Sequence, residues 1–337
     1  ICYAWYDDAH QYPEKLVELT DVATYLDKKY GGWYDVCKKY GIYKGKWISI
    51  PLGASGGKMV YRKSWMNEAG FETFPGDLPG FLKLCQNLKA KGHPAGFALG
   101  NAVGDSGWCY WLMWTHGGKL INEKDQVVIN SPETIAALEY AKQLYETFIP
   151  GTLSWLDPSN NKAFLAGEIS LTSNGISIYY AAKTATDPKI KEMAADIYHA
   201  EYPIGPLGKP SQLNLIVPAM VFKYTKYPNA AKDYIRFMME KEQFEPWSDA
   251  SIGYFSHPLK YYENMKIWTV DPKHTPYRDV LNTSLWPSYA GSLGAQSAGV
   301  HADYVVANMV ASVCSGSKTP KEAAAEAQRR AERYYKL

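Results

Sequence analysis

The chain has 337 residues, which is enough for two domains of ordinary size, each with its own core. Hydrophobic residues make up 46% of the sequence and charged residues 21%, a balance typical of globular proteins. The formal net charge of +2 provides no broad basic field for nucleic acid or a membrane surface, and no run of roughly 18 apolar residues is present to span a bilayer.

Motifs that carry reactive groups or metal ions are missing from the sequence. The seven histidines form no HExxH or His-x-His cluster, and the five cysteines have no CxxC spacing. GxSxG, P-loop and GxGxxG patterns are also absent, so we expect no metal, no cofactor and no enzymatic activity. Aromatic residues are abundant instead, with 27 Tyr, 11 Trp and 10 Phe, which suit a sugar-binding cleft but also fill cores and interfaces.

The first fifty residues have an α/β rhythm. Strand-like runs at residues 1–5 (ICYAW) and 46–52 (KWISIPL) flank a helical stretch around residues 16–29. Asp7 and Asp8 directly follow the first strand and could accept hydrogen bonds from sugar hydroxyls, or they could cap a helix or face solvent. Adjacent carboxylates in a strand or turn usually point apart, which makes them a poor acid–base pair.

A polar, glycine-rich loop turns into an aromatic helix between residues 100 and 114 (GNAVGDSGWCYWLMW). Such a junction exposes backbone N–H groups at the helix start, and the first aromatic rings can stack on the apolar face of a sugar. Asp105 and Trp108 are therefore candidate ligand contacts, whereas Trp111 and Trp114, further into the helix, are expected in the core.

The segment from residue 162 to 180 (KAFLAGEISLTSNGISIYY) reads as a helix end, a tight turn, a short buried strand and a second glycine turn. The strand is expected at residues 169–172, and Asn174 and Gly175 break it. In an α/β sheet, ligands usually bind in the loop after the carboxyl end of a strand, so Asn174 is a candidate contact; a purely structural corner is the alternative. Trp155, in the preceding polar loop, is another candidate, unless it packs the rim of one domain.

An apolar run at residues 215–222 (LIVPAMVF) reads as a strand divided by Pro218, a residue better suited to a hinge or a sheet edge than to a central strand. Asn214 precedes this run and is a candidate contact, as is Trp286 in a proline-rich aromatic stretch. A helix begins at Pro228, and its buried stripe should contain Ala231, Tyr234, Ile235 and Met238.

Two further helix starts are strongly specified. Ser131 can cap a helix that has Pro132 at its first position. Thr319 and Glu322 form a capping box with Pro320 between them, at the start of the last helix.

The order of these elements resembles a known family. Residues 46–53 (KWISIPLG) and 59–71 (MVYRKSWMNEAGF) match its apolar strand, small-residue gap, tyrosine-containing crossing strand and helix, and residues 316–335 look like its closing helix. Together with the helix–glycine–strand–glycine signature at residues 162–180, these motifs make most of the chain similar to the extracellular solute-binding proteins of ABC importers, the group that includes maltose-binding protein. Residues 154–167 (SWLDPSNNKAFLAG) resemble a subgroup usually described as carbohydrate or polyol binders.

This resemblance implies an α/β, two-lobed, periplasmic-binding-protein-like fold of type II, in which a hinge joins two discontinuous lobes. The N-terminal lobe would comprise residues 1–58 and 223–275, and the C-terminal lobe residues 62–217 and 276–337, with hinge crossings near 59–61, 218–222 and 275. By the same comparison, an opening strand–helix–strand portion of the N-terminal lobe is expected to be missing.

The resemblance also implies a function. The protein would bind a small ligand, best a sugar or polyol, in the cleft between its lobes and deliver it to the membrane subunits of an ABC importer. It would be a monomer in the periplasm or outside the cell, with no nucleic-acid partner, and a membrane anchor in the missing portion is left open. The candidate ligand contacts are Asp7, Asp8, Asp105, Trp108, Trp155, Asn174, Asn214 and Trp286.

Three alternatives remain open from the sequence. The same fold could bind an amine, a peptide or an organic anion, since aromatic boxes also hold quaternary ammonium groups. A carbohydrate-active enzyme would need two carboxylates about 5–10 Å apart, with Asp7 or Asp105 as one of them. A non-transport interaction protein would have hydrophobic side chains filling the cleft.

Overall fold

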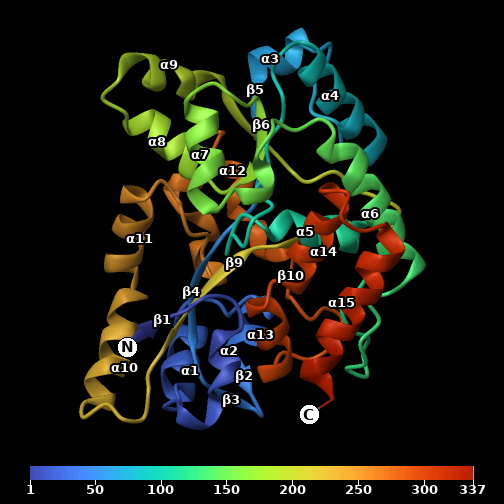
Figure 1. The fold of residues 1–337 in the computed structure, drawn as a ribbon. Helices are drawn as coiled ribbons and strands as arrows, with labels where there is room; N and C mark the ends of the chain where they lie inside the picture. The colour runs from blue at the N-terminus through green and yellow to red at the C-terminus, as the bar shows by residue number, and fades with distance from the viewer. Residues whose placement is uncertain (337) are drawn as a thin grey trace. The chain divides into compact units, whose positions relative to one another are not determined.

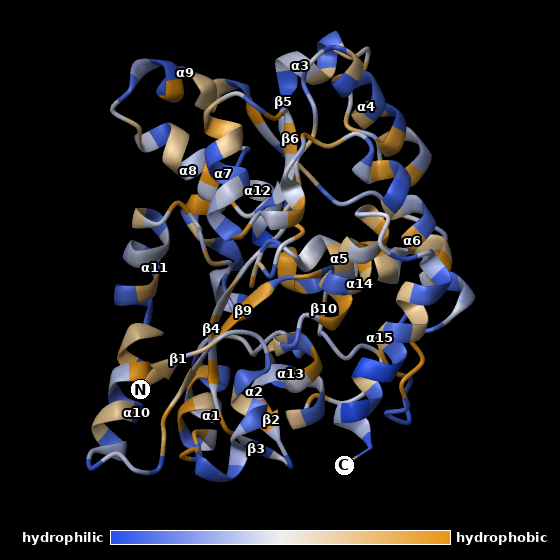
Figure 2. Cartoon of the chain, in the orientation of Figure 1, coloured by the Kyte–Doolittle hydropathy of each residue, from blue (hydrophilic) through white to orange (hydrophobic). Residues whose placement is uncertain are grey.

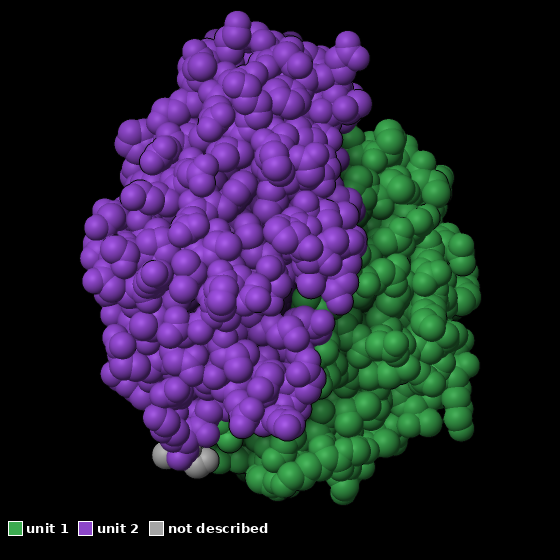
Figure 3. Space-filling model, turned by 90° about the vertical axis from the view of Figure 1, so that its right-hand side faces the viewer, with its two compact units in different colours: residues 1–56, 214–286, 292–299 green, residues 57–213, 287–291, 300–337 purple. Residues whose placement is uncertain are grey.

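The computed structural model describes residues 1–336, which form two compact units (Figure 3). Unit 1 consists of residues 1–56, 214–286 and 292–299; unit 2 consists of residues 57–213, 287–291 and the chain from residue 300 onward. The chain therefore changes unit five times. The long segments change unit after residues 56, 213 and 286. The last of these boundaries differs most from the prediction, because residues 276–286 were expected in the C-terminal lobe but belong to unit 1.

Unit 1 contains short strands and mostly short helices (Figure 1). Its elements are β1 (Cys2–Tyr3), α1 (Thr20–Lys29), α2 (Asp35–Gly41), β2 (Ile42–Tyr43), β3 (Lys46–Trp47), β4 (Ile50–Ser55), β9 (Leu215–Met220), α10 (Pro228–Met238), α11 (Lys241–Ala250), α12 (Thr275–Arg278), β10 (Ser284–Leu285) and α13 (Ala295–Ala302), whose last residues enter unit 2. Single 3₁₀ turns lie at Asp8–Gln11, Pro13–Lys15, Lys260–Asn264, Lys266–Trp268 and Val280–Asn282.

The sheet of unit 1 is antiparallel, with β9 in the centre between β1 and β4. The expectation that Pro218 avoids the centre of a sheet is therefore wrong. Pro218 lies opposite Pro51 of β4, and its carbonyl points the other way, toward β1, where it accepts the Ala4 N–H at 3.0 Å. At such a non-hydrogen-bonded pair neither proline has to donate to the other, so the β4–β9 pairing tolerates both.

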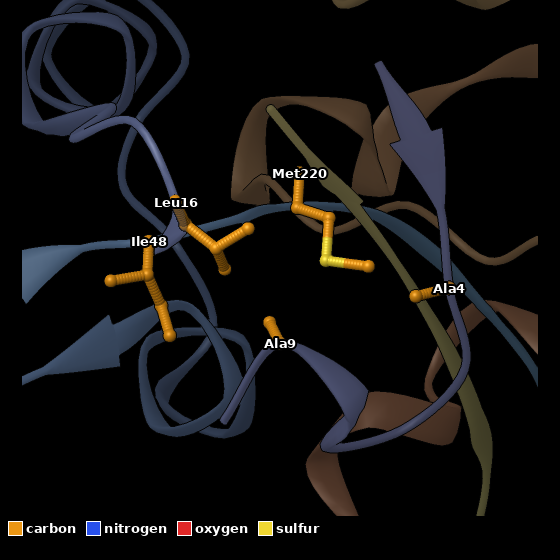
Figure 4. Packing of buried hydrophobic residues seen from close by; sticks show 5 residues of the cluster. All are labelled: Ala4, Ala9, Leu16, Ile48 and Met220. Atoms are coloured by element: carbon orange, nitrogen blue, oxygen red, sulfur yellow. The ribbon is translucent and has the colours of Figure 1, made fainter. Parts of the chain in front are cut away.

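The two faces of this sheet are covered differently. Alternate residues of a strand point to opposite faces. Ala4 and Met220 point to the face where they pack with Ala9, Leu16 and Ile48 in a buried cluster (Figure 4). The side chains of Tyr3 and Trp5 alternate with that of Ala4 and are 52% and 44% exposed, so apolar surface remains accessible on the other face.

Helix α10 buries less of its apolar surface than its sequence predicts. Of the expected stripe, only Ile235 is fully buried, Ala231 and Met238 are half-buried, and Tyr234 is exposed, as is the neighbouring Phe237. Within unit 1, α10 packs against α1 and α11, and these contacts cover only part of its apolar face.

Unit 2 is richer in helices. Its elements are β5 (Lys58–Arg62), α3 (Lys63–Glu68), α4 (Leu78–Ala90), α5 (Gly107–Thr115), α6 (Pro132–Tyr145), a 3₁₀ turn (Thr152–Ser154), α7 (Asp157–Leu165), β6 (Leu171–Asn174), α8 (Ser177–Thr184), α9 (Pro188–Asp196), β7 (Ile197–Ala200), β8 (Gln212–Leu213), α14 (Val305–Cys314) and α15 (Pro320–Tyr335).

An antiparallel sheet in the order β6–β5–β7 and the buried helix α5 organise unit 2. Every residue of α5 is buried, and α14 packs on α5, α6 and α15. The predicted helix starts are confirmed: the Ser131 side chain accepts the Thr134 N–H at 3.2 Å, and Thr319 and Glu322 form the capping box of α15. Strand β6 begins two residues later than expected and includes Asn174.

Candidate functional site

Polar side chains gather in unit 2 where β6 ends and α7 and α8 begin. Asn161 donates through Nδ2 to Ser177 Oγ at 2.9 Å, and Ser177 Oγ donates to Asn174 Oδ1 at 3.0 Å. Asn174 closes the triangle by donating to Asn161 Oδ1. Asn160 is buried behind them and donates to the Ser173 carbonyl at 3.1 Å. Asn174 is almost buried, whereas Asn161 and Ser177 are half-buried, so the triangle retains an accessible side.

Two carboxyl groups extend this cluster. Asp157, at the start of α7, accepts the backbone N–H groups of Val103, Gly104 and Asp105 at 3.0, 2.9 and 2.9 Å, and thereby holds the loop before α5. Asp105 hydrogen-bonds with Asn160, and although part of this residue is exposed, burial of its carboxyl raises the pKa of Asp105 well above its usual range. The nearby Asp157 carboxylate raises it further, because two negative charges repel.

We call this cluster the β6 network; its members are Asp105, Asp157, Asn160, Asn161, Asn174 and Ser177. It brings two of the predicted contacts, Asp105 and Asn174, into one hydrogen-bonded group through the asparagine pair of α7. The sequence reasoning assigned no ligand role to Asn160, Asn161 or Ser177. One sequence signal could have indicated the two asparagines: they are adjacent in the first turns of a helix, and a strand bounded by glycines follows that helix.

The two tryptophans predicted in unit 2 lie elsewhere. Trp108 is completely buried, donates through Nε1 to the Ala98 carbonyl at 2.8 Å, and meets Phe97 and Phe148 edge to face. It is therefore a core residue, which corrects the expectation that its ring is available to stack on a ligand. The half-buried Trp155 packs its ring so closely on Gly96 that a Cβ there would lie 2.8 Å from it. A ligand role for Trp155 stays a prediction.

The aspartates after β1 have structural partners. Asp7 is buried and accepts from Ser297 Oγ at 2.7 Å. Asp8 accepts the Trp5 N–H at 3.1 Å and the Gln11 side-chain amide at 3.2 Å, which ties the turn that follows the strand. These bonds support the structural alternative for both residues, and their role in ligand binding stays a prediction.

The remaining predicted contacts, Asn214 and Trp286, also lie in unit 1. Asn214 is completely buried and donates to the Val280 carbonyl at 2.9 Å, which is a structural bond. Trp286 is half-buried and lines a pocket of about 630 Å³. We call it the Trp286 pocket; Tyr34, Lys39, Lys260, Glu263 and Ser284 are also on its wall.

The Trp286 pocket combines charged groups with aromatic rings. Lys39 Nζ lies 4.6 Å from the centre of the Trp286 ring, a cation–π distance. Tyr34 donates to Glu263 Oε1 at 2.6 Å, and its hydroxyl is 3.0 Å from Nε2 of the buried His257. Burial lowers the pKa of His257 to about 4, so this imidazole is neutral near pH 7. Tyr34 and Glu263 come from distant parts of the sequence and carry no local signal of a shared site.

Within residues 1–336, no group of three or more His, Cys, Asp or Glu side chains is arranged to hold a metal ion. The five cysteines are free thiols, and four of them are buried. In the same part of the chain, no helix has both the length and the apolar character needed to cross a membrane.

The chain forms two units from interleaved segments, and the Trp286 pocket is large enough for a small molecule. This combination is typical of a protein that binds small molecules. The chain belongs to the family of bacterial extracellular solute-binding proteins, whose model matches residues 4–276. This match confirms the predicted family, and the family's name places such proteins outside the cytoplasm. The family is defined by solute binding, and this agrees with the class of function predicted from the sequence.

Curated relatives agree with this assignment. A protein of Brucella abortus (strain 2308) named as a binding protein is 25% identical over 211 residues, which are 60% of this chain and 48% of the relative. One of Deinococcus radiodurans named as an ABC transporter-binding protein is 24% identical over 203 residues, which are 58% of this chain and 47% of the relative. The chain thus spans about half the length of the curated relatives it matches.

Solved structures show the same fold. Maltose-bound MalE3 of T. maritima has a TM-score of 0.83 and 18% identity, over 98% of this chain and 83% of its own. A solute-binding protein of Thermotoga lettingae TMO, with α-D-tagatose bound, has a TM-score of 0.83 and 15% identity, over 98% of this chain and 84% of its own. A solute-binding protein of Agrobacterium radiobacter K84, with ribitol bound, has a TM-score of 0.75 and 18% identity, over 97% of this chain and 82% of its own. The predicted α/β, two-lobed fold class is thereby confirmed.

Proposed function

We propose that this chain is the solute-binding component of an ABC importer, which captures a sugar or polyol and delivers it to the membrane permease. The family assignment supports capture of a small solute. The ligands of three proteins with the same fold, which are maltose, α-D-tagatose and ribitol, support a polyhydroxylated one.

The β6 network is the observation on which this proposal rests. Each sugar hydroxyl both donates and accepts hydrogen bonds, so its binding site needs groups of both kinds. Asn161 and Asn174 provide amide donors and acceptors, Ser177 provides a hydroxyl, and Asp105 provides a carboxyl group. Because each new hydrogen bond contributes on the order of 1 kcal/mol net, several are needed for useful affinity.

The Trp286 pocket supports an alternative ligand class. Its Trp286 ring could stack on a sugar, but Lys39 and Lys260 on the same wall would also attract an anionic ligand. An organic anion bound by the same fold is therefore the second candidate.

In this proposal the two units act as lobes: ligand binding changes their arrangement, and the permease responds to that change. Residues near the changes of unit after residues 56, 213 and 286 would take part in the motion. The protein would be a periplasmic or extracellular monomer, and its anchoring to a membrane stays a prediction. Light scattering during size-exclusion chromatography tests the monomeric state.

A thermal-shift screen against sugars, polyols, amines and organic anions tests the proposed ligand class. A ligand that binds only the folded state raises the melting temperature by mass action. We expect shifts with particular sugars or polyols, and calorimetry followed by recovery of the ligand should show binding without turnover. Shifts confined to anions would favour the second candidate, and turnover of a sugar would contradict the proposal.

An Asn174→Ala variant tests the β6 network directly. It removes one donor and one acceptor from the triangle, so we expect affinity for the ligand found in the screen to fall roughly tenfold or more, about 1.4 kcal/mol. Asn229→Ala, at an exposed position in α10, is the matched control and should bind like the unchanged protein. Equal affinities of the two variants would place the ligand elsewhere.

A further inference from the structure

A buried lysine lies at the start of β5, beside the β6 network. The side chain of Lys58 is only 1% exposed, and its Nζ lies 2.5 Å from Glu201 Oε1. Met59 and Val60 make the middle of the strand hydrophobic, between Lys58 and the charged Arg62 (Figure 2). Because an ammonium group loses its hydration when it is buried, it needs a negatively charged partner. How firmly that partner is held decides whether a ligand can take its place.

The strand register places Lys58 on the same face of the sheet as Asn174. The two residues lie directly opposite each other in the antiparallel pair of β5 and β6. The side chains of such a pair point to the same face, with their Cβ atoms about 5 Å apart. On the other side of β5, Met59 pairs with Ala200, so Glu201 comes next to Lys58. Asn174, Lys58 and Glu201 thus form a row across the end of this sheet.

The other end of β5 carries an ion pair that is held more firmly. Arg62 donates to Asp196 at 2.7 Å, and both side chains are largely buried. Asp196 also accepts the backbone N–H and the hydroxyl of Ser64, at 2.7 and 2.6 Å. By contrast, the Glu201 side chain is 62% exposed and makes no other hydrogen bond within residues 1–336. Glu201 is therefore a counterion that can leave for water at small cost, whereas Asp196 is fixed in place.

These features favour a ligand with one carboxylate. When Glu201 turns into solvent, the buried ammonium requires another single negative charge, and a carboxylate supplies it with the same hydrogen-bonding geometry. A phosphate monoester carries about two charges near pH 7, so one of them would stay uncompensated beside Lys58. Asn174 is one strand spacing away, about 5 Å, so hydroxyls of the same molecule reach the β6 network.

We propose that Lys58 is a specificity-determining residue of the solute site and that it selects polyhydroxylated carboxylic acids, such as aldonic and uronic acids. The carboxylate of the solute replaces Glu201 at the ammonium group, and the hydroxyls bind the β6 network. This inference rests on the proposed function, because it takes the β6 network as the sugar site, and it adds the chemical class of the solute. A neutral polyol binds the network alone and leaves Glu201 in place.

Calorimetric titration with matched pairs of compounds tests this class. D-Gluconate differs from D-glucitol, and D-glucuronate from D-glucose, only in that a carboxylate replaces a CH₂OH group. We expect at least one acid to bind roughly tenfold or more tightly than its neutral partner. Acids that bind no more tightly than their neutral partners, or do not bind at all, would overturn the proposal. Binding of glucitol or glucose in that case would leave the proposed function standing.

Two further compounds complete this series. Hexanoate has a carboxylate but no hydroxyl, and equal affinity for hexanoate and gluconate would contradict the polyhydroxylated solute of the proposed function, and this proposal with it. D-Glucose 6-phosphate tests the charge of the ligand, and tighter binding than that of glucuronate would overturn the choice of a carboxylate.

Two variants separate recognition of the solute from a structural ion pair. Lys58→Met removes the buried charge and leaves Glu201 in water, so the fold should be retained, and gluconate should then bind no more tightly than glucitol. Glu201→Gln removes the competing carboxylate and should strengthen gluconate binding severalfold, with no change for glucitol. A purely structural ion pair predicts no such gain, so its absence would overturn the exchange of carboxylates. Lys91→Met, at an exposed position of unit 2, is the control and should bind like the unchanged protein.

Thermal melts of the same variants keep the test valid if one of them is less stable. Gluconate should raise the melting temperature of Glu201→Gln more than that of the unchanged protein, and should not raise that of Lys58→Met. Lys39→Met examines the Trp286 pocket in the same way. Loss of gluconate binding in Lys39→Met but not in Lys58→Met would place the carboxylate in that pocket and overturn the proposal.

Discussion

Trp108 and Asn174 show how different two residues predicted as ligand contacts can be. Trp108 fills the interior of unit 2, whereas Asn174 belongs to a network with an accessible side. Both follow loops that are typical of binding sites, and the sequence does not distinguish them. Whether the first aromatic residue of α5 points outward or inward depends on Phe97 and Phe148, which pack against it from distant segments.

The placement of Trp108 predicts a loss of stability in Trp108→Ala. Removing a fully buried tryptophan should lower the free energy of unfolding by about 3–5 kcal/mol, because the cavity is only partly filled. Urea unfolding followed by circular dichroism measures this loss, with Tyr224→Ala as an exposed control. A variant of unchanged stability that no longer binds ligand would restore the predicted stacking role.

His257 predicts a pH dependence of stability. Burial lowers its pKa from 6.5 to about 4; Asp279 opposes this effect and Arg278 adds to it. The unfolded chain therefore binds a proton at a higher pH than the folded chain does. The contribution of His257 is fully present above pH 6.5 and is lost as the pH falls toward 4, by at most about 3 kcal/mol.

Urea unfolding across this pH range, for the unchanged protein and for His257→Gln, isolates that contribution from the carboxyl groups that titrate nearby. Glutamine cannot be protonated but can still hydrogen-bond with Tyr34, so the variant should lose less stability on acidification. Identical pH profiles would show that His257 is protonated without cost in the folded protein.

At the scale of the element, the sequence predicts local features well and sheet positions poorly. The starts of α6 and α15 depend on side chains within three residues of each helix, so they are readable from Ser131 and Thr319. The central position of β9 depends on β1 and β4, which come from another part of the chain. Toward β4, Pro218 needs no N–H because it pairs with Pro51, and this pairing cannot be read from the neighbouring sequence.

The capping box of α15 predicts the effect of removing one hydroxyl. Thr319→Ala should lower the free energy of unfolding by about 1 kcal/mol, because the Glu322 N–H loses its acceptor. Thr319→Ser keeps the hydroxyl and is the matched control. Thermal melts of both variants measure the difference, and an alanine variant as stable as the serine variant would contradict a capping role.

At the scale of the whole molecule, the resemblance predicts two discontinuous lobes, but not all of their boundaries. Residues 276–286 were expected with the C-terminal lobe, yet they belong to unit 1, where the Ser256 hydroxyl donates to the Arg278 carbonyl at 3.1 Å and Asn214 donates to the Val280 carbonyl. These bonds join side chains to backbone carbonyls, which every residue type supplies, so composition gives no sign of them.

Discontinuity predicts that the longest segment of unit 2 cannot fold alone. A fragment of residues 57–213 lacks α14 and α15, which pack on α6 and, for α14, also on α5. We expect it to show no cooperative thermal transition by near-ultraviolet circular dichroism, and a separate piece of residues 287–336 should restore the transition when both are co-expressed. A cooperative melt of the shorter fragment alone would contradict this expectation.

The interleaving of the two units also determines how late in translation each unit can fold. Unit 1 includes residues 292–299, and unit 2 needs the helices that follow residue 300, so neither unit has all of its parts until nearly the whole described chain has been made. A growing chain that folds domain by domain finishes one domain before the next emerges. Here both units reach completion almost together, and the nascent polypeptide must keep its apolar segments from aggregating throughout translation.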